Sequence, residues 1–310
     1  MRTISVPYHL DEYVSGFEAP LPPERTITAE LADGDVWARM ADLYRPVADT
    51  VADNAQRGER SLVMSSDCTT SLAVVAGLQH AGQAPSVVWF DAHGDVQTLE
   101  TSTSGYLGGI PLRLIAGYRT ELIADAIDLT PVAEDAIVLV DARDLDPPER
   151  AYLERSRIRH VAIDELATDV LPSGPIYLHI DLDVINPEYL SGQLFPAAGG
   201  PTVQAVAQAV SRVVDVGRVA AVGLGCTWRP GHGAAARVQA VVDAAIRNSP
   251  APGDRPGGTF DPKARPAEYP HATRAPRQPP KGPTAPVTGW LSRLGRVSRI
   301  SAGGSLMIGE

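Results

Sequence analysis

The sequence predicts an α/β fold in which a mainly parallel sheet lies between two layers of helices. Short apolar runs typical of buried strands alternate along the chain with segments that carry apolar residues at helical spacing. Acidic motifs directly follow two of these runs, as expected at the carboxyl ends of parallel strands. At 310 residues, the chain is long enough for one large domain with a buried core.

Strands are predicted where short runs rich in Val, Ile, Leu and Phe end in a polar or glycine-containing turn. Two of these runs are the clearest, because aspartates follow each of them at once. Strands that are separated by helices imply a mainly parallel sheet and hence three layers. The predicted strands cover residues 2–8, 61–66, 86–90, 136–142, 160–163, 176–180 and 219–225.

Helices are predicted between these strands. Met40, Leu43 and Val47 recur at intervals of three or four, which places them on one face of a helix. Pro147 and Pro148 suit the first turn of the helix that follows them. The predicted helices cover residues 35–54, 70–80, 149–156, 203–216 and 234–247, with a Pro-rich connection before the first and a polar loop over 96–109.

Composition excludes several classes of protein. The net charge of −10 argues against nucleic acid as the main partner. No apolar run approaches ~20 residues and no N-terminal segment resembles a signal peptide, so we expect no membrane span. Cys68 and Cys226, the two cysteines, form no disulfide framework and suit a reducing cytoplasm. We therefore expect a cytoplasmic protein.

Residues 249–310 differ in composition from the rest of the chain. They are rich in proline and contain both lysines, Lys263 and Lys281, so this segment is basic whereas the body is acidic. Such a stretch cannot bury enough apolar surface to fold alone. We predict a catalytic domain over residues 1–248 and a disordered tail over 249–310. Two alternatives stay open: a short amphipathic helix near 290–297 that docks on a partner, and out-of-frame translation of a GC-rich gene.

Five side chains of the types that bind metals follow two of the predicted strands. Residues two apart on a strand point to the same face, so these side chains can converge. Carboxylates with one imidazole suit divalent manganese, iron, cobalt or zinc, and so much negative charge in a cleft needs a cation. The sequence therefore predicts a metal site. Its residues are Asp91, His93 and Asp95 after the first strand, and Asp181 and Asp183 after the second.

With both motifs placed, roughly residues 60–230 resemble the ureohydrolase family of arginase, agmatinase and formiminoglutamase. The family motifs are Gly-Gly-Asp-His, then Asp-x-His-x-Asp, then Asp-x-Asp; the first reads Ser65-Ser66-Asp67-Cys68 here. The resemblance implies an arginase/deacetylase-like fold, a trimer or hexamer, and two Mn²⁺ ions that activate water to attack a guanidino carbon. By the family pattern one ion takes Cys68, Asp91, Asp95 and Asp181, the other takes His93, Asp91, Asp181 and Asp183, and Asp95, His93 and Asp183 act in catalysis.

Two further segments resemble the substrate-binding parts of arginases. The loop with Gln97, Ser102 and Ser104 resembles the one that binds the substrate's α-carboxylate, with Gln97 in place of the usual Asn. Asp146 and Glu149 correspond to the pair that holds the α-amino group. Together these contacts imply an amino-acid substrate and disfavour agmatine. Asp146 and Glu149 are also compatible with an ordinary acidic pair at a helix N-terminus.

Three positions depart from the family pattern. Cys68 replaces a metal-binding His, and thiolate prefers ions softer than manganese, so we consider a weak or empty metal position, a Zn²⁺ or Fe²⁺ site, or a buried thiol beside a single ion. Gly108 replaces a proton-shuttling His, and loss of a general acid typically costs about 10²- to 10⁴-fold in rate. Thr227 stands nearest to the Glu that pairs with the guanidinium, so a cationic guanidinium is a doubtful substrate.

These departures favour a neutral substrate. Together with Cys68, the segment Tyr106-Leu107-Gly108-Gly109 resembles the specialised ureohydrolase that hydrolyses hydroxyarginine in cycloserine biosynthesis. The resemblance implies a metal-dependent hydrolase of arginine or an arginine derivative, N-hydroxyarginine favoured, that releases ornithine and urea or hydroxyurea. The alternatives are an agmatinase- or formiminoglutamase-like enzyme, a deacetylase-like amide hydrolase, and a protein of the same fold that binds an amino acid without turnover.

Overall fold

The structure is a computed structural model that describes residues 1–247. In this part of the chain, eight strands form one sheet in which every neighbouring pair is parallel. The strand order is β4-β1-β5-β10-β9-β6-β7-β8. The predicted parallel α/β fold is therefore confirmed. The strands are β1 (Arg2–Val6), β4 (Arg25–Thr26), β5 (Ser61–Ser65), β6 (Ser86–Asp91), β7 (Ile137–Asp141), β8 (Arg159–Val161), β9 (Ile176–Asp181) and β10 (Val219–Gly225).

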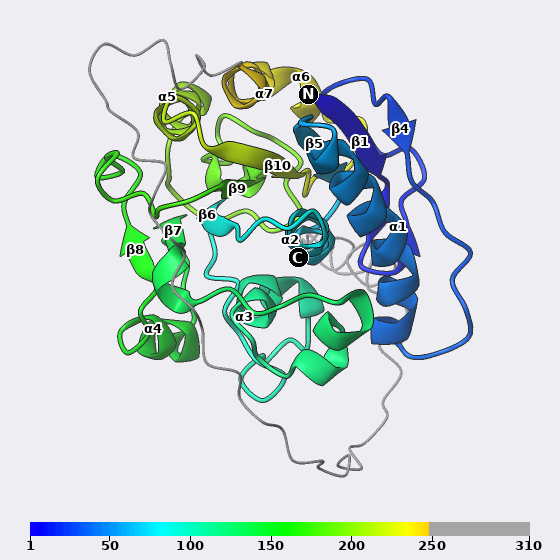
Figure 1. Ribbon diagram of the computed structural model, residues 1–310. Helices are drawn as coiled ribbons and strands as arrows, with labels where there is room; N and C mark the ends of the chain where they lie inside the picture. The colour runs from blue at the N-terminus through cyan, green and yellow to red at the C-terminus, as the bar shows by residue number, and fades with distance from the viewer. Residues whose placement is uncertain (248–310) are drawn as a thin grey trace, which may run out of the picture. The chain divides into compact units, whose positions relative to one another are not determined.

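Helices cover both faces of this sheet, as Figure 1 shows. Side chains alternate along each strand, so Trp89 of β6 packs into the core under α1 and α2, whereas Phe90 packs into the core under α5 and α7. The predicted three layers are confirmed. The helices are α1 (Val36–Gln56), α2 (Ser71–His80), α3 (Pro111–Ile115), α4 (Pro147–Leu153), α5 (Val203–Val214), α6 (Ala234–Arg237) and α7 (Gln239–Ile246).

Side-chain caps begin two of the long helices. Asp35 accepts a hydrogen bond from the backbone N–H of Ala38 at 2.9 Å, and Thr202 accepts one from Ala205 at 3.1 Å. These bonds satisfy N–H groups that have no partner inside the helix. Both helices consequently start within two residues of the predicted positions.

The first predicted strand is shorter than expected. β1 ends at Val6, and the chain then forms a two-stranded antiparallel hairpin of β2 (Tyr8–His9) and β3 (Glu12–Tyr13). Leu10 lies in the turn of this hairpin with a φ of 56°. This left-handed conformation is rare for leucine, so the sequence does not predict a turn there. The sequence reading also missed β4, the short edge strand inside the Pro-rich connection.

The last predicted helix is two helices, α6 and α7, that meet at Val238. Val238 has a φ of −90° and a ψ of 6°, outside the helical region. No glycine or proline marks this position, so the helical spacing of apolar residues runs through the break unchanged.

The sheet order determines where the predicted site residues meet. β5, β10, β9 and β6 are consecutive neighbours, and the segments after their carboxyl ends carry the two aspartate motifs, Cys68 and Thr227. In residues 1–247, no helix combines the length and apolar character needed to cross a bilayer. The Pro-rich tail predicted for 249–310 lies outside the described residues, so the division of the chain at residue 248 stays a prediction.

Candidate metal centre

A cavity of about 200 Å³ opens at the carboxyl ends of the central strands. All twelve residues that the sequence predicts for the metal and substrate sites line this cavity. Four of them are aspartates with no more than 4% of their surface exposed. The twelve are Cys68, Asp91, His93, Asp95, Gln97, Ser102, Ser104, Asp146, Glu149, Asp181, Asp183 and Thr227.

Strand alternation, the predicted cause of this convergence, does not bring the later residues of each motif together. β6 ends at Asp91 and β9 ends at Asp181, so the later residues of each motif do not continue a strand. Instead, Asp91 accepts a hydrogen bond from the backbone N–H of His93 at 2.7 Å, and Asp181 accepts one from Asp183 at 2.8 Å. Each motif therefore turns by the same side-chain-to-backbone bond, which requires an acceptor two residues before the turn ends.

Two compact groups of ligand-type atoms share Asp91. One contains Cys68, Asp91 and His179, and the other contains Asp91, His93 and Asp183; within each, the candidate atoms lie within 4.8 Å of one another. The family pattern implies that Asp91 and Asp181 bridge the two ions. Asp91 belongs to both groups, whereas Asp181 and Asp95 belong to neither, and the ligand sets stay a prediction. The Cys68 thiol also donates a hydrogen bond to Asp181 Oδ2 at 2.8 Å.

The electrostatics of the cavity favour a cation. Burial, reinforced by the charge of neighbouring aspartates, raises the pKa of Asp95 and Asp181 well above the usual range and that of Asp183 to about 6. Burial opposes the charging of His93, but its hydrogen bonds to Asp183 and Asp91 raise the pKa of its imidazole to about 12. Carboxylates held this close together ionise together only when a positive charge lies among them.

The donor set fits a divalent metal. Several buried side-chain atoms in the described part of the chain have no hydrogen-bond partner, and two of them, Asp95 Oδ2 and His179 Nε2, belong to residues of this centre. Among the described residues that line the cavity there is no lysine or arginine to neutralise the aspartates. Unpaired buried acceptors are costly, and coordination to an ion satisfies them. The residues present provide oxygen, nitrogen and sulfur ligands, which suits a transition ion better than Mg²⁺ or Ca²⁺.

The sequence reading missed three residues at this site. His179 precedes Asp181 by two positions on β9, so the period of the strand was a signal that placed it on the same face. Tyr106 lines the cavity, and its hydroxyl lies 2.9 Å from Nε2 of His9 on β2. His9 and Tyr106 are 97 positions apart, and no local pattern connects them.

The residues proposed to hold an amino-acid head are bound to one another. Gln97 donates a hydrogen bond to Asp146 at 2.7 Å, and Asp146 and Glu149 form a capping box at the start of α4. Glu149 Oε1 also accepts a hydrogen bond from the backbone N–H of Val96 at 3.2 Å. The hydrogen bonds of Asp146 and Glu149 are thus those of an acidic pair at a helix N-terminus, which is the alternative that the sequence left open. Both side chains also line the cavity. Thr227 donates to Asp181 at 2.7 Å.

Glu149 leads to a prediction about stability and pH. Burial raises the pKa of its carboxyl to about 7, above the value of about 4.3 in an unfolded chain, so the folded state binds more protons between these values. The stabilising contribution is complete below about pH 4 and is lost as the pH rises through 7. We expect the unfolding free energy of wild type, relative to Glu149→Gln, to fall by about 3–4 kcal/mol over this range.

Urea titrations of chelator-treated protein at several pH values measure this difference. Glu154→Gln, at the exposed end of the same helix, controls for the loss of one carboxyl. A difference between wild type and Glu149→Gln that does not change with pH would contradict the prediction.

Comparison with known proteins identifies the family. Residues 12–225 match the arginase family. The arginase of Bacillus caldovelox is 28% identical over 177 residues, which are 53% of this chain and 59% of that protein. The N(omega)-hydroxy-L-arginine amidinohydrolase of Streptomyces lavendulae is 27% identical over 145 residues, 46% of this chain and 51% of that protein. The matched stretch therefore spans little more than half the length of these relatives.

The fold agrees with this assignment. The crystal structure of the arginase from Bacillus cereus superposes with a TM-score of 0.69 at 20% sequence identity, covering 79% of this chain and 97% of that one. The two proteins thus share the three-layer parallel architecture. Because the family match covers more than half of the sequence and includes both aspartate motifs, the chain belongs to the arginase family.

Proposed function

We propose that this protein is a metal-dependent hydrolase of the guanidino or amidino C–N bond of an amino acid. The observation that carries the proposal is the convergence of all twelve selected residues on one cavity in a chain of the arginase family. The products are ornithine and urea, or hydroxyurea when the guanidino group is hydroxylated. Asp146 and Glu149 bind the α-amino group of the amino-acid head, and Gln97, Ser102 and Ser104 bind its α-carboxylate.

The metal is held by the buried acidic centre. Its proposed ligands are Cys68, Asp91, His93, Asp95, Asp181 and Asp183. These residues would hold two divalent ions, which would supply an activated water nucleophile at neutral pH and a positive charge to polarise the attacked group. Mn²⁺ is the ion that the family implies, whereas the Cys68 sulfur favours Zn²⁺ or Fe²⁺.

Contacts at two positions that depart from the family pattern, Thr227 and Gly108, support a neutral substrate. Thr227 contributes a hydroxyl that is bound to Asp181 rather than a carboxylate that pairs with a guanidinium. A side chain at Gly108 would overlap the ring of Tyr106, so Tyr106 takes the space of the missing histidine. N-hydroxyarginine fits this environment, because its hydroxyguanidine is far less basic than the guanidine of arginine and enters uncharged.

We assign to Tyr106 a hydrogen bond with the hydroxyguanidine of the substrate. His9 Nδ1 lies 3.0 Å from the carbonyl oxygen of Ser66, to which it must donate, so His9 Nε2 accepts from the Tyr106 hydroxyl. The Tyr106 oxygen is then oriented as an acceptor. The N–OH group of N-hydroxyarginine is the matching donor.

Turnover assays test the proposed function. The full chain, loaded with Mn²⁺, Zn²⁺ or Fe²⁺, is supplied with L-arginine, N-hydroxy-L-arginine and agmatine, and ornithine, urea and hydroxyurea are quantified. We expect the highest kcat/KM with N-hydroxy-L-arginine. Absence of turnover with every substrate and metal would refute the proposal. A ligand-induced rise in Tm without turnover would instead support the amino-acid-binding protein.

Replacing Tyr106 tests its contact with the substrate. We expect Tyr106→Phe to lower kcat/KM for N-hydroxy-L-arginine by about tenfold, as loss of one hydrogen bond of about 1–1.5 kcal/mol implies. The effect on L-arginine is smaller, because arginine lacks the N–OH donor. Tyr13→Phe, on the exposed surface of β3, is the matched control. An equal loss for both substrates would assign Tyr106 a role in packing alone.

A further inference from the structure

His179 is a buried imidazole for which the proposed function has no use. It lies in the middle of β9, and only 2% of its surface is exposed. In the part of the chain that the structure describes, its Nε2 has no hydrogen-bond partner. A buried ring nitrogen without a partner is costly, so an unexplained one indicates a missing ligand.

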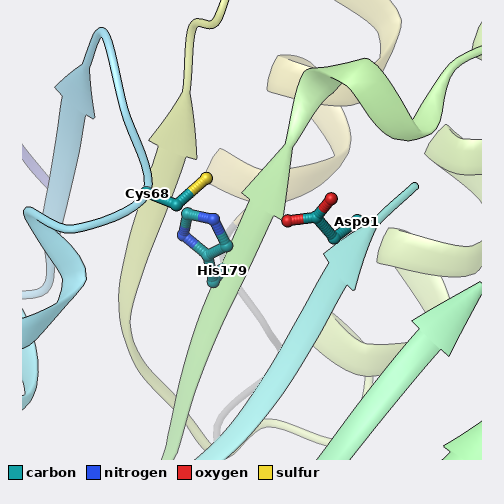
Figure 2. Close-up of side chains that lie close together, drawn as sticks. All are labelled: Cys68, Asp91 and His179. Atoms are coloured by element: carbon teal, nitrogen blue, oxygen red, sulfur yellow. The ribbon is translucent and has the colours of Figure 1, made fainter. Parts of the chain in front are cut away.

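The ring is held in one orientation. His179 Nδ1 lies 3.0 Å from the hydroxyl of Ser71, which begins α2, and the Tyr177 hydroxyl donates to the same Ser71 oxygen at 2.7 Å. Figure 2 shows that the other ring nitrogen points toward Cys68 and Asp91. When a histidine binds a metal through Nε2, its Nδ1–H is normally bound to an oxygen acceptor, and Ser71 can serve as that acceptor.

The neighbouring strands are shaped around this ring. Trp89 on β6 packs over it with 3.7 Å between ring centroids. On β10, Gly223 is in register with His179, and a side chain there would lie 3.2 Å from His179 Nδ1 and overlap the Tyr177 hydroxyl. Glycine at this position is therefore needed for the Tyr177–His179 pair. The Trp89 indole also donates to Asp91 Oδ2 at 3.1 Å, which orients that carboxylate beside the ring.

We propose that His179 Nε2 is a metal ligand, and that with Cys68 and Asp91 it forms a sulfur–nitrogen–oxygen position for a Zn²⁺-like ion. The three candidate ligand atoms lie within 4.8 Å of one another. Ligands around a tetrahedral zinc stand about 2.0–2.3 Å from the ion and hence roughly 3.3–3.8 Å from one another, so the three side chains draw together when they bind it. His179 on β9 thus supplies an imidazole to the centre in which Cys68 replaces the histidine of the family pattern. The inference rests on the proposed function, since it presupposes that the site binds metal.

The ligand assignment is tested by spectroscopy on the full chain. Zn²⁺ is added to metal-free protein with ¹⁵N-labelled histidines, and the Nε2 resonance of His179 is assigned by its loss in His179→Gln. We expect this resonance to shift on Zn²⁺ binding while Nδ1 stays protonated. X-ray absorption of the same zinc-loaded protein is expected to lose one imidazole scatterer in His179→Gln but none in His160→Gln, an exposed histidine on β8.

The affinity of the thiolate-containing position gives a second measure. With Co²⁺ as the probe, the thiolate-to-cobalt absorption band is expected to require at least 100-fold more metal in His179→Gln, beyond the 10–100-fold that loss of an outer contact costs. An unchanged His179 resonance in wild type, under conditions where Zn²⁺ binding is confirmed separately, would overturn the inference. Wild type that binds no metal would refute the proposed function as well, whereas metal binding without the shift refutes only the role of His179.

Discussion

Asp91→Asn is expected to abolish turnover and to weaken the binding of both metal ions by more than 100-fold. Asp91 is the member common to the two compact groups, so one substitution removes a charged ligand from each. Asparagine has the same size and retains one oxygen, which can still accept from the backbone N–H of His93, so the local turn is preserved. The hydrogen bond from the Trp89 indole to the other carboxylate oxygen is lost. The expected loss exceeds the 10–100-fold of an outer contact, because a negative ligand is removed outright.

Metal analysis of protein purified without chelator, together with kcat/KM for N-hydroxy-L-arginine, measures this effect. Asp141→Asn is the matched control, because Asp141 ends the neighbouring strand β7 in register with Asp91 but pairs with Arg143 instead of lining the cavity. We expect that control to retain its metal. If Asp91→Asn bound metal as well as Asp141→Asn does, Asp91 would not bridge the two positions.

The sequence predicted the sheet and the members of the site for different physical reasons. The order of strands and helices follows from the spacing of apolar residues, which is a local property of the sequence and can be recognised segment by segment. The members of the site follow from parallel strands, whose carboxyl ends meet at one edge wherever the strands are adjacent. For that reason Asp91 and Asp181 were found together although the strand alternation assumed for His93 and Asp183 was wrong.

What sequence reasoning did not find depends on tertiary contacts. His9 reaches Tyr106, a residue that lines the cavity, because Leu10 turns a hairpin in a left-handed conformation, which no pattern of apolar residues indicates. His179 was visible by strand period, but its meaning depends on Ser71 and on Gly223, which lie on other elements. Buried partners of this kind are set by packing between elements, and packing is not encoded at fixed spacing.

Cys68→Ser is expected to weaken Zn²⁺ binding by more than 100-fold while changing Mn²⁺ binding much less, because only the softer ion gains from a sulfur ligand. Burial, with added repulsion from Asp181, Asp95 and Asp91, raises the pKa of the Cys68 thiol well above its usual value. The thiol is therefore protonated in the metal-free protein and donates to Asp181. A metal that binds the sulfur must displace this proton.

Proton release makes the role of Cys68 measurable without an activity assay. Binding to the sulfur expels one proton, so Zn²⁺ affinity rises with pH at every pH below the pKa of the thiol. A plot of the logarithm of the Zn²⁺ association constant against pH is therefore expected to have a slope one unit larger in wild type than in Cys68→Ser. Calorimetric titrations in buffers of different ionisation enthalpy count this proton. Cys226→Ser is the matched control, because Cys226 is also a buried thiol whose pKa is raised by burial but lies outside both ligand groups. Equal proton release by wild type and Cys68→Ser would mean that the sulfur remains a thiol beside the metal, and the selectivity for soft ions would then need another cause.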